Sequence, residues 1–160
     1  MKRRFNLPVE WAVLCFCAWQ AADLAIAWRH SPFDAVGWVA LVIWLIPSLA
    51  SRLWWCRGNA LPRRRPLLAW LALGACLAGI VTDMHFLKHC SFALACAAIT
   101  PAFPGFCLWF ILALAWMPAL GWLLGGVRPL GVVLVRVALA LVAALTALIG
   151  LRRGLRKLPK

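Results

Sequence analysis

Residues 89–127 read HCSFALACAAITPAFPGFCLWFILALAWMPALGWLLGGV, a run of 39 residues without Asp, Glu, Lys or Arg. An α-helix rises about 1.5 Å per residue, so one continuous helix here would be about 58 Å long, roughly twice the ~30 Å hydrocarbon core of a bilayer. The chain must therefore turn back within the run. We expect the turn at residues 100–105, Thr-Pro-Ala-Phe-Pro-Gly, because Pro lacks a backbone donor and disfavours helix in the residue before it.

Composition indicates the same class of protein. The chain of 160 residues is 66% hydrophobic, and its mean hydropathy is +0.91, well above what a soluble domain shows. The length leaves room for one membrane domain and no separate soluble one. We therefore predict an all-α, polytopic integral membrane helix bundle with a single transmembrane domain over residues 1–160.

Apolar stretches between the charged positions define the candidate spans. All but the fourth are near the ~20 residues that a membrane helix needs. An alternative replaces the fourth and fifth spans by a re-entrant hairpin with its tip at Pro101–Pro104, which requires the tip to be buried in protein or to line water. The six spans are residues 11–28, 35–55, 67–82, 90–100, 106–124 and 130–151.

The basic residues predict the orientation. With the N-terminus in the cytoplasm, 13 of the 17 Lys and Arg fall on the inner side, as the positive-inside rule requires. An odd number of passes through residues 89–127 would translocate the basic tail. Six spans and the re-entrant hairpin both avoid this, and both leave the two termini in the cytoplasm. We expect the membrane to be a bacterial inner (plasma) membrane. Residues 1–27 also have the pattern of a cleavable signal peptide, although Glu10, Gln20 and Asp23 favour an uncleaved first span.

The expected partners follow from this topology. The basic ends serve as topology signals and contact anionic lipid headgroups. No basic surface on a soluble scaffold exists, so no nucleic-acid partner is predicted. We expect the protein to contact the lipid bilayer and other membrane protein subunits.

The 11 Trp residues are unusually many for 160 positions. Most fall near predicted span ends, where the aromatic belt of a membrane protein lies. Trp19, Trp44 and Trp116 fall in the middle of spans, where we expect packing rather than the lining of a cavity. Pro47 and Pro118 are expected to kink their spans.

Small residues predict where helices approach closely. Gly74 with Ala78, and Ala75 with Gly79, follow the small-x-x-x-small spacing that allows tight helix packing in membranes. The spacing is common by chance in such sequences and names no partner.

The scarce polar residues gather on the predicted outer side, which makes this side the first candidate site. His85 and His89 are four residues apart, so on a helix they share a face and could bind one metal or haem, with Asp83 orienting a His. The competing interpretation is a polar loop whose His side chains face water. No cofactor is the stronger expectation, with a metal or haem as the alternative. The outer cluster comprises His30, Asp34, Asp83, His85, His89 and Cys90.

A second candidate is an intramembrane polar pair. Asp23 and Arg136 fall at similar depth below the outer ends of the first and last spans. An unpaired charge in hydrocarbon costs ~2.5 kcal/mol or more, so such residues usually pair. We predict that Asp23 pairs with Arg136 and joins these spans, and that a functional version would line an ion or proton path. The alternative is that Arg136 extends to the headgroups.

One resemblance to a known family rests on two residues. Cys90 opens a predicted span, and Arg128 follows 38 residues later on the predicted outer side. This faintly resembles the exosortase and archaeosortase transpeptidases, in which a Cys, an Arg and a later His carry catalysis on the outer face. No His follows Arg128 in this sequence.

Two classes of function remain. The first is an accessory or transport subunit of a membrane assembly, favoured by short loops and few polar groups. The second is an outer-face membrane enzyme or metal- or haem-binding protein that uses the outer cluster, with the exosortase-like reaction as its most specific form. We expect the first class.

Overall fold

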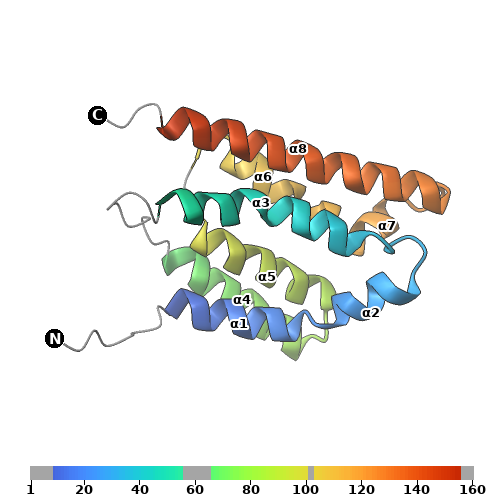
Figure 1. Cartoon of the computed structure of the whole chain (residues 1–160). Coiled ribbons are helices and arrows are strands. Elements are labelled where there is room, and N and C mark those ends of the chain that lie inside the picture. The colour runs from blue at the N-terminus through green and yellow to red at the C-terminus, as the bar shows by residue number, and fades with distance from the viewer. Residues whose placement is uncertain (1–8, 56–65, 101–102, 156–160) are drawn as a thin grey trace. The chain divides into compact units, whose positions relative to one another are not determined.

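The computed structural model describes residues 9–55, 66–100 and 103–155, and throughout these ranges the ordered elements are helices (Figure 1). The predicted all-α class is confirmed. In chain order the elements are α1 (Val9–Gln20), α2 (Asp23–His30), α3 (Gly37–Trp55), α4 (Pro66–Val81), α5 (His85–Ile99), α6 (Phe106–Ile111), the 3-10 helix η1 (Leu112–Ala115), α7 (Ala119–Leu123) and α8 (Pro129–Leu155).

The helices form two compact units. The first unit contains α1, α4 and α5, and the second contains α2, α3 and α6 to α8. The first unit has a buried core of its own, made by Val13, Cys17, Ala72, Cys76 and Ala95.

The first unit is built on a hairpin of α4 and α5, against which α1 packs. Four small residues line the buried face of α4 at the spacing of one helical stripe: Ala69, Ala72, Cys76 and Gly79. At Gly79 the helices approach so closely that a Cβ would lie 3.0 Å from the backbone nitrogen of Lys88. Small side chains allow two helices to approach this closely.

The predicted small-residue pairs are only partly right. Gly79 lies in the interface, but a Cβ added to Gly74 would have no atom within 4 Å, and Gly74 is exposed, as is Ala78. The buried stripe of small residues on α4 starts at Ala69 instead. Spacing alone did not distinguish the buried face of α4 from its exposed face, because Ala and Gly occur on both.

In the second unit, α3 and α8 run side by side, and α6 and η1 pack against α8 (Figure 1). The chain before α6 contacts the far part of α8 closely. A Cβ on Gly150 would overlap the carbonyl oxygen of Pro104, and one on Gly105 would lie 2.8 Å from Cγ2 of Thr146. Gly105 also has φ of 88°, a left-handed conformation that favours glycine.

The helix in the long uncharged run is interrupted at the place where the sequence predicts a turn. Helix α5 ends at Ile99, and α6 begins at Phe106 after the turn that contains Gly105. The hairpin tip proposed at Pro101–Pro104 lies partly outside the described residues, because positions 101 and 102 are not among them.

Two of the predicted spans are not single helices. Residues 11–28 divide into α1 and α2 between Gln20 and Asp23, and residues 106–124 divide into α6, η1 and α7. Among the described helices, α8 alone is long and apolar enough to cross a membrane, over Pro129–Arg153, and α1 with α2 qualifies only when the two are taken together across their break. The other apolar helices, including α4 and α5, are shorter.

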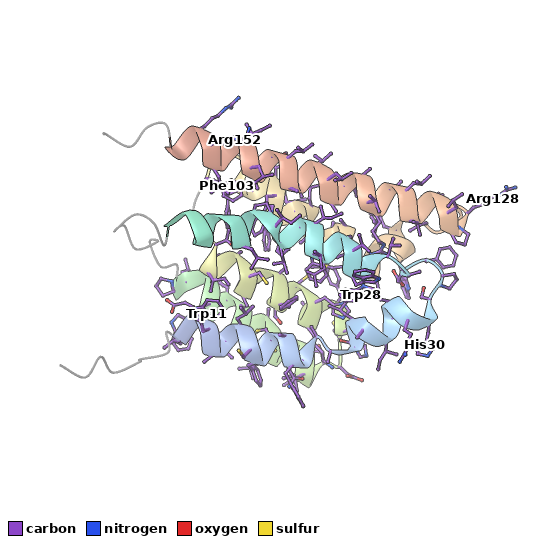
Figure 2. All side chains as sticks on the ribbon, viewed as in Figure 1. Trp11, Trp28, His30, Phe103, Arg128 and Arg152 are labelled. Carbon is purple, nitrogen blue, oxygen red and sulfur yellow. The ribbon has the colours of Figure 1, made fainter. Side chains whose placement is uncertain are left out.

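Many large apolar side chains of the described helices are exposed, whereas small residues occupy many of the helix contacts, although Trp44, Trp109 and Trp116 are fully buried. On α8 the buried positions include Ala140, Ala143 and Ala147, whereas Leu134 and Leu145 are exposed to 63% and 58%. Figure 2 shows the side chains that project along this helix between Arg128 and Arg152. Other described helices follow the pattern, with exposed large apolar residues that include Trp19, Ile26, Trp38, Leu49, Leu67, Trp70, Leu77 and Ile111.

Candidate functional site

The most distinctive polar site lies in the second unit, around Arg136 of α8. The Arg136 side chain is completely buried. Its Nη1 donates to the carbonyl oxygens of Ala115 at 2.9 Å and Met117 at 3.1 Å. Its Nη2 donates to Oδ1 of Asp34 and, at 3.4 Å, to the carbonyl of Phe33. The guanidinium therefore joins α8 to two separate segments of the chain.

The acceptor carbonyls are available because the helix is interrupted there. After α6 the chain tightens into the 3-10 helix η1, and Trp116 and Met117 donate three residues back, to Ala113 and Leu114. Pro118 has no N–H with which to continue an α-helix. The kink expected at Pro118 is therefore a full break.

A second side chain completes this arrangement. Trp28 of α2 donates from Nε1 to the carbonyl of Trp116 at 3.1 Å. The carbonyls of three successive residues, Ala115 to Met117, thus accept hydrogen bonds from Arg136 and Trp28. The Met117 carbonyl also accepts from the backbone N–H of Leu120 at 3.2 Å. Unpaired carbonyls are costly away from water, so the two side chains stabilise the break chiefly at Ala115 and Trp116.

Glycine allows Trp28 to reach this position. A Cβ on Gly37, at the start of α3, would overlap Nε1 of Trp28. Any larger residue at 37 would therefore displace the indole ring. Trp28, Asp34, Gly37 and Arg136, with the carbonyls of residues 115–117, together form what we name the Arg136 site.

The carboxylate in this site is Asp34 and not Asp23. The sequence predicted Asp23 as the partner of Arg136, whereas the acid that pairs with the guanidinium is Asp34. Asp34 lies in the turn between α2 and α3, where its own carbonyl accepts from the backbone of Gly37 at 2.8 Å, and it is 7% exposed. The sequence places Asp34 in a loop, and only the packing of that loop against α8 brings it to Arg136.

The predicted outer cluster falls in both units. Asp83, His85, His89 and Cys90 lie in the first unit, whereas His30 and Asp34 lie in the second. His85 is the exposed first residue of α5, His89 is buried and Cys90 is half-buried. In the part of the chain that the structure describes, no group of three or more His, Cys, Asp or Glu could hold a metal ion.

Asp83 has a clear structural role. It has φ of 52° at the end of α4, where its N–H donates to Ile80 and the N–H of Met84 donates to Gly79. These two bonds form a Schellman motif, which ends a helix through one left-handed residue. The Asp83 carboxylate also pairs with Lys88 at 3.2 Å.

Three tryptophans form the aromatic centre of the second unit. The rings of Trp44 and Trp109 stack with centroids 4.3 Å apart and planes 5° apart. Each donates from Nε1 to the other's backbone carbonyl, at 2.8 Å and 3.1 Å. Trp116 packs edge-on against Trp44 at 5.8 Å. Trp44 and Trp116 are buried as expected, whereas Trp19, in the first unit, is 78% exposed.

The remaining candidate residues have simple surroundings. Nδ1 of His30 lies 3.0 Å from the carbonyl of Ile26, one turn back in α2. Arg128 is exposed just before α8 and belongs to the second unit, whereas Cys90 belongs to the first. Comparison with known proteins found no matching family model, no matching curated protein and no matching solved structure.

Proposed function

We propose that the protein is a non-catalytic, multi-pass subunit of a membrane assembly, with an accessory or transport role. The observation that carries this proposal is the large number of exposed Leu, Ile, Val and Trp side chains on the described helices, with Ala at many buried helix contacts. The exceptions are Trp44, Trp109 and Trp116, which pack together at the centre of the second unit. Small residues at helix contacts and large apolar residues at the surface are what a lipid environment favours.

The Arg136 site supports a structural role for the polar residues. Its guanidinium donates to three backbone carbonyls and one carboxylate of the same unit. An ionisable residue within a span is by default a candidate for function. Here the donors hold a broken helix in place, which is the role we assign to them.

The proposed topology has six passes and both termini in the cytoplasm of a bacterial inner membrane. In this arrangement α1 with α2 forms the first pass, and α6, η1 and α7 form a broken fifth pass. The arginines at the two ends of α8 support it, since Arg152 and Arg153 lie in its last turn whereas Arg128 precedes its first. The positive-inside rule then assigns the Arg152 end to the cytoplasm.

Reporter fusions test the topology. Green fluorescent protein should fluoresce when fused after residue 160, and alkaline phosphatase should be active when fused after Asp83 or Gly126. A phosphatase fusion after Pro104 should be inactive under six passes. Membranes washed in alkaline carbonate should retain the full chain, and release of the protein into the wash would contradict the proposal.

The assembly is tested on detergent-solubilised native membranes. The tagged protein should elute with at least one other integral membrane protein at fixed stoichiometry, and the mass of the particle should exceed that of 160 residues plus detergent. A particle that contains this chain alone would contradict the accessory role. The proposed membrane location would not be affected by that result.

A further inference from the structure

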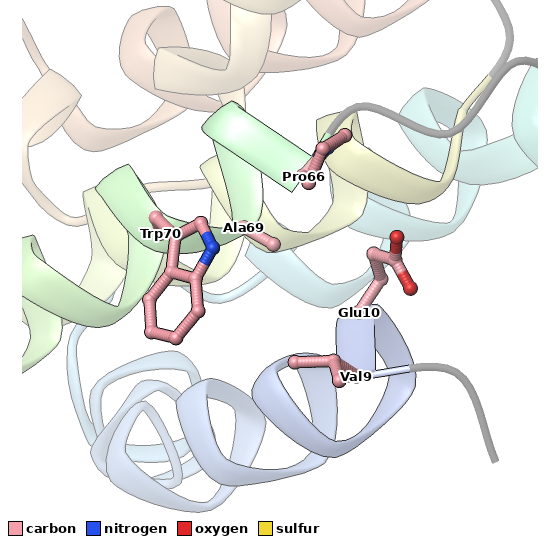
Figure 3. A pocket seen from close by; sticks show the side chains of 5 residues that line it. All are labelled: Val9, Glu10, Pro66, Ala69 and Trp70. Atoms are coloured by element: carbon pink, nitrogen blue, oxygen red, sulfur yellow. The ribbon is translucent and has the colours of Figure 1, made fainter. Parts of the chain in front are cut away.

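A pocket of about 180 Å³ opens in the first unit where α1 and α4 begin (Figure 3). Val9 and Glu10 line it from the first turn of α1, and Pro66, Ala69 and Trp70 line it from the start of α4. One water needs only about 10–15 Å³. The pocket therefore has room for a polar group with several carbon atoms attached.

Glu10 is the one ionisable side chain in this lining, and it is only 8% exposed. Among the residues that the structure describes, no hydrogen bond or ion pair to the Glu10 carboxylate is present. Its place in the first turn of a helix is favourable for a negative charge, and a counter-ion or a hydrogen-bond donor stabilises a carboxylate in so little-exposed a residue. The pocket is thus suited to a cation.

Trp70 indicates what kind of cation. Its indole and the Glu10 side chain lie on either side of Ala69 (Figure 3), and Trp70 is 63% exposed. An aromatic face and a carboxylate are the two groups that bind an organic ammonium ion. Calcium and magnesium take about six or more oxygen ligands, which a single carboxylate does not provide. The apolar Val9, Pro66 and Ala69 fit the carbon atoms next to an ammonium.

The surroundings indicate that the ammonium belongs to a lipid. In the sequence, Lys2-Arg3-Arg4 precede α1 and Arg63-Arg64-Arg65 precede Pro66, so basic residues that attract phosphate flank both helix starts. Under the proposed topology both starts lie at the cytoplasmic leaflet, and an exposed Trp such as Trp70 is typical of the headgroup level. We propose that this pocket binds the terminal ammonium of an ethanolamine phospholipid, with Glu10 as counter-ion and Trp70 against the ammonium. This inference rests on the proposed membrane location.

The test measures lipid binding to the full chain purified in detergent. Short-chain phosphatidylethanolamine and phosphatidylglycerol share the phosphate and differ in the ammonium, and native mass spectrometry counts each bound lipid. We expect a preference for phosphatidylethanolamine of roughly tenfold, which Glu10→Gln abolishes and Trp70→Leu weakens several-fold. The control Trp38→Leu changes a Trp that is 56% exposed in the second unit, and it should leave the preference intact.

Two results would overturn the proposal. One is equal affinity of the unchanged protein for both lipids. This result is expected if a basic side chain of the protein itself, and not a lipid ammonium, pairs with Glu10. The other is a preference that persists in Glu10→Gln. Misfolding does not obscure the result, because Glu10→Gln removes a buried charge and keeps the shape, so its thermal midpoint without lipid should be equal or higher. Failure of the membrane proposal would instead appear as loss of the protein from carbonate-washed membranes.

Discussion

At the scale of the residue, the Arg136 site shows a buried charge used mainly to satisfy backbone carbonyls. Arg136 donates to the carbonyls of Ala115, Met117 and Phe33 as well as to Asp34. The two kinds of acceptor have different consequences for mutation. A carboxylate can be removed together with its cation, but the carbonyls of a broken helix remain and still need donors.

Replacing Arg136 should therefore cost more than replacing Asp34. Arg136→Met is expected to lower the free energy of unfolding by about 3–5 kcal/mol because it removes the donor to a buried carboxylate and to the carbonyls of Ala115 and Phe33. Asp34→Asn should cost less, and the double variant Arg136→Met, Asp34→Leu should not recover. Unfolding in detergent by a denaturant measures all three.

The control for this series is Arg153→Met, which changes an exposed arginine of the same helix and should stay within about 0.5 kcal/mol. Full recovery in the double variant would show that the site is an ion pair alone and that the carbonyl bonds contribute nothing.

Gly37 offers a test of close packing. Gly37→Ala places a methyl group where the Trp28 indole lies, overlapping its Nε1. The variant should be less stable by about 1–3 kcal/mol because the ring is displaced and its bond to the Trp116 carbonyl is lost. Thermal unfolding followed by circular dichroism measures this.

Gly74→Ala is the matched control. It lies within α4 with no atom within 4 Å of a Cβ at that position, so the variant should be neutral or more stable, by up to about 1 kcal/mol. Equal behaviour of Gly37→Ala and Gly74→Ala would contradict the packing described for Trp28.

At the scale of the element, the sequence predicted where helices occur better than where they break. The boundaries 35–55, 67–82 and 130–151 agree closely with α3, α4 and α8. The break within residues 11–28 was missed, although Gln20 and Asp23 flank it, because the apolar residues on both sides predict one span. The break within residues 106–124 was predicted only as a kink at Pro118. Asp34 was likewise missed as the partner of Arg136, since the path of a loop depends on tertiary packing and not on local sequence.

The turn between α4 and α5 allows a test at this scale. Asp83 has φ of 52°, which costs an ordinary residue about 1–2 kcal/mol relative to glycine. Asp83→Gly should therefore be more stable than Asp83→Ala by about 1 kcal/mol, although both lose the exposed pair with Lys88. Thermal midpoints of the two variants decide this, and a more stable Asp83→Ala would show that the left-handed turn is not formed.

At the scale of the whole molecule, the exposed apolar side chains can be used to test whether lipid or water surrounds the protein. A triple variant of α8 with Leu134→Gln, Leu141→Gln and Leu145→Gln changes exposed positions only. In a bilayer α8 of this variant should integrate less efficiently, because polar groups in hydrocarbon are costly, and green fluorescent protein fused after residue 160 should fluoresce less than on the unchanged protein. A gain of folded, monomeric protein in detergent-free buffer would contradict the membrane proposal.

The order of synthesis gives the Arg136 site a further consequence. The carbonyls of Ala115 and Met117 are made 21 and 19 residues before the arginine that serves them. When the segment between α6 and α7 is synthesised, Arg136 has not yet been translated. The break can therefore be completed only after α8, the last described helix, has been synthesised, and a chain that stops short of it lacks the side chain that donates to the carbonyl of Ala115.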